Sequence, residues 1–208
     1  SREALSLYQQ QGEVFLDVAG RSRLVQSTLP TLTFGLRFFD YDLDGYQDLV
    51  LANGHIEPEI NAVQKDIQYA QAPQLFWNDG EGQLRDVSRT TGGLFAKSLI
   101  GRGLAVGDID ADGDPDVLLT TNGGRAYLLR NDGPVGNSVT LHLRGKAPNL
   151  DALGALVTAS AGTARQQRMV RTGSSYLSHS ATALNFGLGT KAKVDRLEIR
   201  WPDGKEEV

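Results

Sequence analysis

The chain contains no cysteine among its 208 residues. This absence excludes disulfide bonds and a cysteine nucleophile, and it leaves the redox compartment of the protein open. No apolar run approaches the ~20 residues that a membrane-spanning helix requires, so we expect no membrane span. Lysine and arginine do not gather into a basic cluster, so nucleic acid is not an expected partner.

Hydrophobic residues make up 40% of the chain, charged residues 22%, and the net charge is −4. These values are typical of a globular protein, and the length suits one large or two small domains. The first residue is Ser1 rather than methionine, and no signal-peptide pattern follows it. We therefore interpret the chain as an excised or processed piece of a protein.

One acidic pattern, D-x-D-x-D-G-x-x-D, is present twice. The first copy begins at Asp40 and the second, 68 residues later, at Asp108. At an effective dielectric constant near 20, two unit charges ~4 Å apart repel by about 4 kcal/mol. A hard divalent cation relieves such repulsion, and calcium accepts about 6–8 oxygen ligands. The pattern predicts two calcium sites; two solvated acidic turns are the alternative.

These loops are not EF-hands. An EF-hand requires a bidentate glutamate at loop position 12, where this chain has Leu51 and Leu119. Short apolar runs lie on both sides of each loop and are typical of buried strands, while Gly45 and Gly113 permit the sharp turn between them. The sequence therefore predicts two strand–loop–strand units.

A second repeating unit is a β-hairpin. It is clearest at residues 75–87, looser at residues 7–18, and begins again at residues 127–133. The order is thus a half unit and two full units, and four strands per period are typical of β-propeller blades. Two blades and a fragment cannot close a ring. We expect a truncated propeller or an open arc whose exposed edges can mediate oligomer formation.

An insertion at residues 54–73 separates the two strand pairs of the first full blade. Its Ile60, Val63 and Ile67 are spaced to line one face of a short helix. Loops of this length often have a function. The alternative is a loop that only covers apolar surface of the blade.

The pattern changes at about Ser138, where alternating apolar and polar residues predict half-buried strands of an antiparallel sheet. These strands are expected at residues 139–144, 155–159, 165–171 and 194–201, followed by a hairpin turn at 202–204. We predict an all-β chain with incomplete propeller blades at residues 1–137 and a small β-sandwich-like domain at residues 138–208. The chain ends near the start of one further strand.

The strand–loop–strand units resemble the FG-GAP/VCBS repeats of integrin-type propellers. The C-terminal part resembles an ASPIC/UnbV domain through residues 149–157, 173–180, 185–189 and 194–204. The combination is similar to the cartilage acidic protein family and its bacterial relatives, although the earlier blades are lacking. The resemblance implies a calcium-stabilised, extracytoplasmic protein: secreted, periplasmic or on the cell surface.

The resemblance also implies which residues bind calcium at each site. In each loop, four aspartate side chains and the carbonyl of position 7 are the implied ligands, and the side chain of Asp114 is expected to point away from the second site. The implied set is Asp40, Asp42, Asp44, Tyr46 and Asp48 in the first loop, and Asp108, Asp110, Asp112, Asp114 and Asp116 in the second.

Three functions remain open from the sequence. The favoured one is a calcium-binding interaction or adhesion module for an unidentified protein or carbohydrate ligand. An enzyme or accessory protein of natural-product biosynthesis, implied by the UnbV resemblance, and a purely structural scaffold are the alternatives.

The candidate residues favour a non-enzymatic role. Acid–base chemistry could come from His55 beside Glu57, or a ligand could bind at Tyr176, Ser178 and His179. The alternative for the serine-rich run is hydrogen bonding within a turn.

Overall fold

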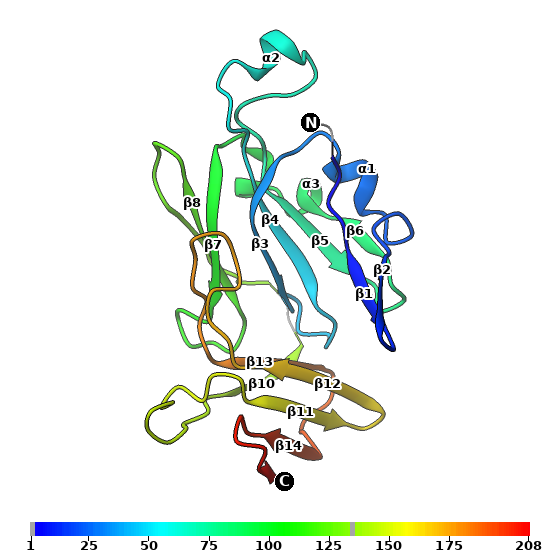
Figure 1. The fold of residues 1–208 in the computed structure, drawn as a ribbon, viewed down its shortest axis with the longest axis vertical. Helices are drawn as coiled ribbons and strands as arrows, with labels where there is room; N and C mark the ends of the chain where they lie inside the picture. Colours follow the sequence, from blue (N-terminus) through cyan, green and yellow to red (C-terminus); the bar gives the residue numbers. More distant parts are fainter. Residues whose placement is uncertain (1–2, 134–135) are drawn as a thin grey trace.

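The structure, a computed structural model, describes residues 3–133 and 136–208. It consists of antiparallel β-sheets and a few short helices, which confirms the predicted all-β class (Figure 1). No helix in the described residues has the length and apolar character needed to cross a membrane.

The N-terminal part contains a hairpin and the first of two larger sheets. The elements are β1 (Tyr8–Gln11), β2 (Val14–Asp17), α1 (Leu24–Thr28), β3 (Thr33–Phe39), β4 (Asp48–Asn53), α2 (Ile60–Val63), β5 (Gln74–Asn78), β6 (Leu84–Asp86) and α3 (Ser88–Thr91). Strands β3, β4, β5 and β6 pair in that order, as expected for a full blade, and β1 pairs with β2 as the predicted half unit.

The second unit differs from its prediction. After a 3-10 helix at Gly93–Ala96, strands β7 (Gly101–Gly107), β8 (Asp116–Thr121) and β9 (Tyr127–Leu129) form a sheet of three strands. A full blade requires a fourth strand, and the described residues provide none here. The prediction of a second full unit is therefore wrong, and the β7–β9 sheet is consistent with a partial propeller blade.

Strand β4 is buried along its whole length because both of its faces are covered. Val50 and Ala52 belong to a core shared with the β7–β9 sheet, whereas Leu49 and Leu51 belong to a second core with Leu24 of α1. A strand covered on both faces has an uninterrupted apolar sequence. This explains the apolar run that follows the first acidic pattern.

The innermost strands of the two sheets, β3 and β7, lie unusually close to each other. A Cβ atom at Gly35 would lie 2.7 Å from the carbonyl oxygen of Arg102 and 2.8 Å from the Cβ atom of Leu104. Only glycine permits this approach of two backbones. Gly103 follows Gly35 by the same 68 residues that separate Asp40 from Asp108. A Cβ atom there would lie closest to the hydroxyls of Thr120 and Ser178, not to another backbone.

The C-terminal part has two sheets. The strands are β10 (Asn137–Leu141), β11 (Leu156–Ala161), β12 (Ala164–Met169), β13 (Leu184–Gly189), β14 (Arg196–Arg200) and β15 (Glu206–Glu207). Strand β10 pairs with β13, and the second sheet has the order β12-β11-β14-β15. Val157 and Phe186, both 0% exposed, pack between the sheets in one core, as in a sandwich.

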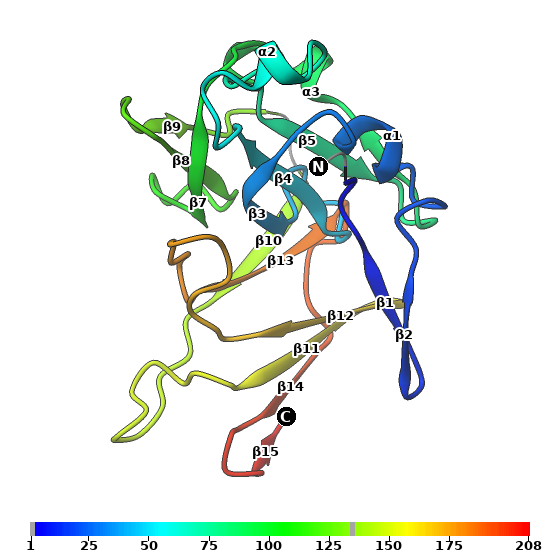
Figure 2. The same cartoon turned by 45° about the horizontal axis from the view of Figure 1, so that its top comes forward.

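The β10–β13 sheet lies between the N-terminal sheets and the β11–β12–β14 sheet (Figures 1 and 2). It contacts the loop that joins β3 to β4: Gly136 N donates to Asp42 O (2.9 Å) and Gly189 N donates to Leu43 O (2.8 Å). The insertion at residues 54–73 extends from the opposite end, where its helix α2 is labelled in Figure 1.

The helix of the insertion is shorter than its spacing predicts. It covers only Ile60–Val63; Ile60 and Ile67 are buried, but Val63 is 81% exposed. The predicted common face is therefore wrong: Val63 is exposed although it belongs to the helix, and Ile67 lies beyond it because the chain leaves the helical conformation at Gln64.

Candidate metal centres

The first acidic loop (residues 40–48) joins β3 to β4, and the second acidic loop (residues 108–116) joins β7 to β8. Both begin with the same hydrogen bond. Asp40 Oδ2 accepts from Gly45 N (3.0 Å), and Asp108 Oδ2 accepts from Gly113 N (3.1 Å). The residue at position 4 has positive φ in both loops, 59° in Leu43 and 62° in Ala111. Two sequences that share only acids and glycine thus adopt one backbone geometry.

The last aspartate of each loop closes it. Asp48 is 0% exposed and accepts two backbone hydrogen bonds, from Tyr41 N (3.0 Å) and Asn78 N (2.8 Å). Both of its oxygen atoms are therefore used within the protein. The equivalent donors to Asp116 are Ile109 N (2.8 Å) and Asn131 N (2.9 Å).

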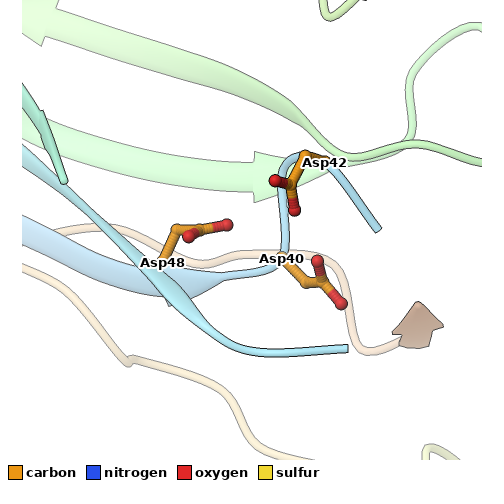
Figure 3. A group of neighbouring side chains, drawn as sticks. All are labelled: Asp40, Asp42 and Asp48. Carbon is orange, nitrogen blue, oxygen red and sulfur yellow. The ribbon is translucent and has the colours of Figure 1, made fainter. Parts of the chain in front are cut away.

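Each loop brings three carboxylates together. Oxygen atoms of Asp40, Asp42 and Asp48 lie within 4.8 Å of one another, and Figure 3 shows these side chains around the end of β3 and the start of β4. The second group consists of Asp108, Asp110 and Asp112, within the same limit. The two acidic patterns therefore form two compact clusters of oxygen donors, each of which could hold a metal ion.

The first aspartate of each cluster has a free acceptor. Among the described residues, Asp40 Oδ1 and Asp108 Oδ1 are buried and have no hydrogen-bond partner. A buried carboxylate oxygen without a partner is costly, and a cation would satisfy it. Burial, followed by the charge of Asp44, raises the pKa of Asp40 to about 7, and burial raises the pKa of Asp48 to about 8. The donors are all oxygen, which suits a hard cation such as calcium.

Other predicted ligands lie less centrally. Asp44 Oδ1 accepts from Tyr46 N (2.8 Å), and the Tyr46 ring is half exposed beside Gly80. The Asp114 side chain is 4% exposed and lies against the Asp112 carboxylate. Burial, together with Asp112, raises its pKa to about 7. The Asp114 carboxylate is not one of the three that gather in the second cluster, and the expectation that it points away from the site stays a prediction.

Two asparagines hold the acidic loops, and the sequence analysis did not identify them. The backbone N–H of Asn78 donates to Asp48, and its side-chain Nδ2 donates to Gln47 O (2.9 Å). The side-chain Nδ2 of Asn131 donates to Tyr41 O (2.7 Å). This last bond joins the segment just after β9 to the first acidic loop. A signal was present, since each asparagine begins an Asn-Asp-Gly sequence. That sequence was interpreted only as a turn.

Serine side chains of residues 173–180, here the serine segment, bond the free edges of β3 and β7. Figure 1 shows this part of the chain in front of β7. The hydroxyls accept hydrogen bonds from backbone N–H groups of the inner strands, and Ala181 N donates to Val106 O (3.0 Å). The pairs are Leu36 N to Ser175 Oγ (3.1 Å), Leu104 N to Ser178 Oγ (2.9 Å) and Val106 N to Ser180 Oγ (3.1 Å). Their role is thus to attach the C-terminal part.

The proposed acid–base residues do not form an acid–base pair. His55 is buried and its Nδ1 accepts from the backbone N–H of Glu57 (3.0 Å), whose side chain is exposed. His179 is exposed, and Tyr176 packs edge-on against Phe34 with 5.0 Å between ring centroids. His55 and Tyr176 thus have structural contacts, and ligand binding at these candidate residues stays a prediction.

Arg102 connects His55 to Phe34, the ring against which Tyr176 packs, and the sequence analysis did not identify it. Its guanidinium lies 4.1 Å from the centroid of the Phe34 ring and donates to His55 O (2.9 Å) and Gly54 O (2.9 Å). A cation over an aromatic face is attractive. The insertion is thereby tied to the inner strand that Tyr176 also contacts.

The fold and the acidic loops define an all-β repeat protein with two clusters of oxygen donors. The model of the FG-GAP-like repeat matches residues 40–119, which include both acidic loops, and the model of ASPIC and UnbV matches residues 145–208. The chain is an FG-GAP-like repeat protein with a C-terminal ASPIC and UnbV domain. No curated protein matches it.

Proposed function

We propose that this chain is a calcium-binding interaction module of an extracytoplasmic protein. FG-GAP-like repeats are typical of extracellular proteins, and the repeat covers both acidic loops. The observation that carries the proposal is the repeated loop geometry, in which the first aspartate keeps one buried oxygen without a partner. A turn with only a structural role has no need of a buried oxygen without a partner, and this oxygen is present in both loops.

The predicted ligand sets would hold the two calcium ions. Bound calcium would supply positive charge to offset the mutual repulsion of the carboxylates. The ends of the loops are held without an ion, because Asp48 and Asp116 accept hydrogen bonds from the backbone N–H groups of Asn78 and Asn131. Calcium would therefore stiffen the end of each sheet where the C-terminal domain is attached.

The interaction partner, a protein or a carbohydrate, is expected to bind away from the loops. The insertion extends from the opposite end and exposes Ile56 (66%) and Val63 (81%). In the described residues the second sheet ends at β9, whose outer edge pairs with no strand. Such an edge can also pair with another copy of the chain, so we propose self-association through β9 as a second mode.

A purely structural role is the second candidate. It is favoured by the serine segment, since three hydroxyls attach the C-terminal domain to β3 and β7. In that case calcium would only hold the domains together and no ligand would bind.

Thermal denaturation with calcium and with a chelator tests the calcium proposal. A site at 100 times its dissociation constant contributes ~2.7 kcal/mol. Two such sites should raise Tm by roughly 10–20 °C in a chain of this size. Magnesium is the control ion, and Asp40→Asn with Asp108→Asn is the control variant, in which the gain should vanish. An equal Tm in calcium and in chelator would refute the proposal.

A further inference from the structure

A cavity of about 300 Å³ lies where the ends of β3 and β7 meet β12 and β13. This volume is at the lower end of the range of small-molecule pockets, about 300–1,000 Å³. Three of its lining residues are arginines, Arg37, Arg168 and Arg171, and we call it the arginine cavity. It lies beside the acidic loops but is built mainly from side chains that the calcium proposal does not use.

Arg37 has buried donors that nothing in the described residues satisfies. Its Nε and Nη1 atoms are inaccessible to solvent and have no hydrogen-bond partner. The charged group that perturbs it is another cation: burial, and then Arg171, lower the pKa of Arg37 to about 10. A buried guanidinium beside a like charge is unfavourable unless an anion accompanies it.

Arg168 adds a second, half-buried cation to the same wall. Its Nη1 donates to Gln167 O (3.1 Å) and its Nη2 to Gln166 Oε1 (3.1 Å), both neutral acceptors. The opposite charge that acts on it is Asp40. If Asp40 binds calcium, that carboxylate is no longer available to offset Arg168. The positive character of the cavity should then increase.

The rest of the wall is largely apolar. Phe39, Val106, Leu156, Met169 and Leu184 line the cavity together with the arginines. Asp40 and Asp108 also line it, and their unpartnered oxygens are the ones assigned above to cations. A bare inorganic anion would leave the apolar wall unfilled, whereas a carboxylate with a short hydrocarbon body would contact both kinds of surface.

We propose that the arginine cavity binds a small organic carboxylate, whose carboxylate group pairs with the positive charge of the Arg37 guanidinium and whose apolar part packs against Phe39 and Leu184. Arg37 provides the positive charge of this site whether or not the loops bind calcium. Calcium is expected to tighten binding, because it offsets the loop carboxylates that repel an anion.

Calorimetric titration of the protein with sodium hexanoate at constant ionic strength tests the proposal, once with calcium and once with chelator. We expect saturable binding of one hexanoate, tighter with calcium. Arg37→Gln should weaken it by about 10- to 100-fold, because the charge that pairs with the carboxylate is lost. The matched control is Arg125→Gln, an exposed arginine outside the cavity, which should bind like the unchanged protein. Hexanamide, which has no charge, should not bind.

Other results would overturn the proposal. If no probe binds saturably in either condition, the cavity holds only water. If sulfate binds and hexanoate does not, the organic carboxylate is wrong. Calcium titration of Arg37→Gln is run in parallel and should be unchanged, so failure of the calcium sites is recognised separately. Should Arg37→Gln not fold, the exposed Arg171→Gln variant decides: hexanoate binding unaffected by it contradicts the proposal.

Discussion

Replacement of Asp48 by alanine should destabilise the protein even when calcium is absent. Asp48 is 0% exposed, and its two oxygens accept from Tyr41 N (3.0 Å) and Asn78 N (2.8 Å). Asp48→Ala leaves both buried N–H groups without an acceptor, at about 1–3 kcal/mol each. Part of this cost is offset because a desolvated carboxylate, whose pKa burial raises to about 8, is removed as well.

The net loss should be about 2 kcal/mol, the lower end of that sum, which corresponds to a fall in Tm of roughly 4–8 °C. Circular dichroism during heating at pH 8 in chelator measures it. Asp110→Ala is the matched control, since the Asp110 side chain is 35% exposed and belongs to the second cluster. It should lose less stability without calcium. Equal losses in chelator would refute the view that Asp48 holds the loop by itself.

Three further predictions follow from the structure. The pKa of Asp40 is raised to about 7 in the folded protein, whereas the ordinary value is 3.8. The folded state therefore binds a proton that the unfolded chain has already released, so the free energy of unfolding in chelator should fall as pH rises from 5.5 to 8. The Tm gained from calcium should be larger at pH 8, and a gain independent of pH would contradict this. Ser178→Ala removes the acceptor of Leu104 N, so hydrogen exchange at that amide should accelerate; unchanged protection would show that the hydroxyl does not hold the strand. Gly35→Ala places a Cβ atom 2.7 Å from a carbonyl oxygen and should cost about 1–3 kcal/mol in urea denaturation, whereas Gly20→Ala, with nothing within 4 Å, should be neutral.

The acidic loops could be predicted from the sequence because their signal is local. Spacing of acids and glycine determines the turn, and Leu51 and Leu119 at position 12 exclude the EF-hand without any tertiary information. The apolar flanks likewise predicted buried strands, and β4 and β8 follow the two loops, each beginning at the last aspartate of its loop.

Features that depend on distant contacts could not be predicted. The hydroxyl of Ser175 accepts a hydrogen bond from a strand residue 139 positions away, and that of Ser178 from one 74 positions away. The local sequence can indicate only hydrogen bonds within a turn. The burial of the Asp114 side chain could not be predicted either, because the pattern gives ligand order but not side-chain burial. The arginine cavity exists only where two domains meet, and Arg37 by itself resembles any polar residue of a strand.

The boundary predicted between residues 137 and 138 stays a prediction, as do the individual ligand assignments. The structure does show that β10 begins at Asn137 and pairs only with β13 of the C-terminal part among the described strands. A protein made of residues 138–208 would test whether this part folds alone. The contacts of β10 and β13 with the first acidic loop suggest that it would lose stability when separated.

Calorimetric titration with calcium tests the central claim most directly, because it counts the sites. The unchanged protein should bind two calcium ions, and the single variants Asp40→Ala and Asp108→Ala should each bind one, since each removes the unpartnered oxygen of one loop. No saturable heat with the unchanged protein, or two sites remaining in either variant, would contradict the account.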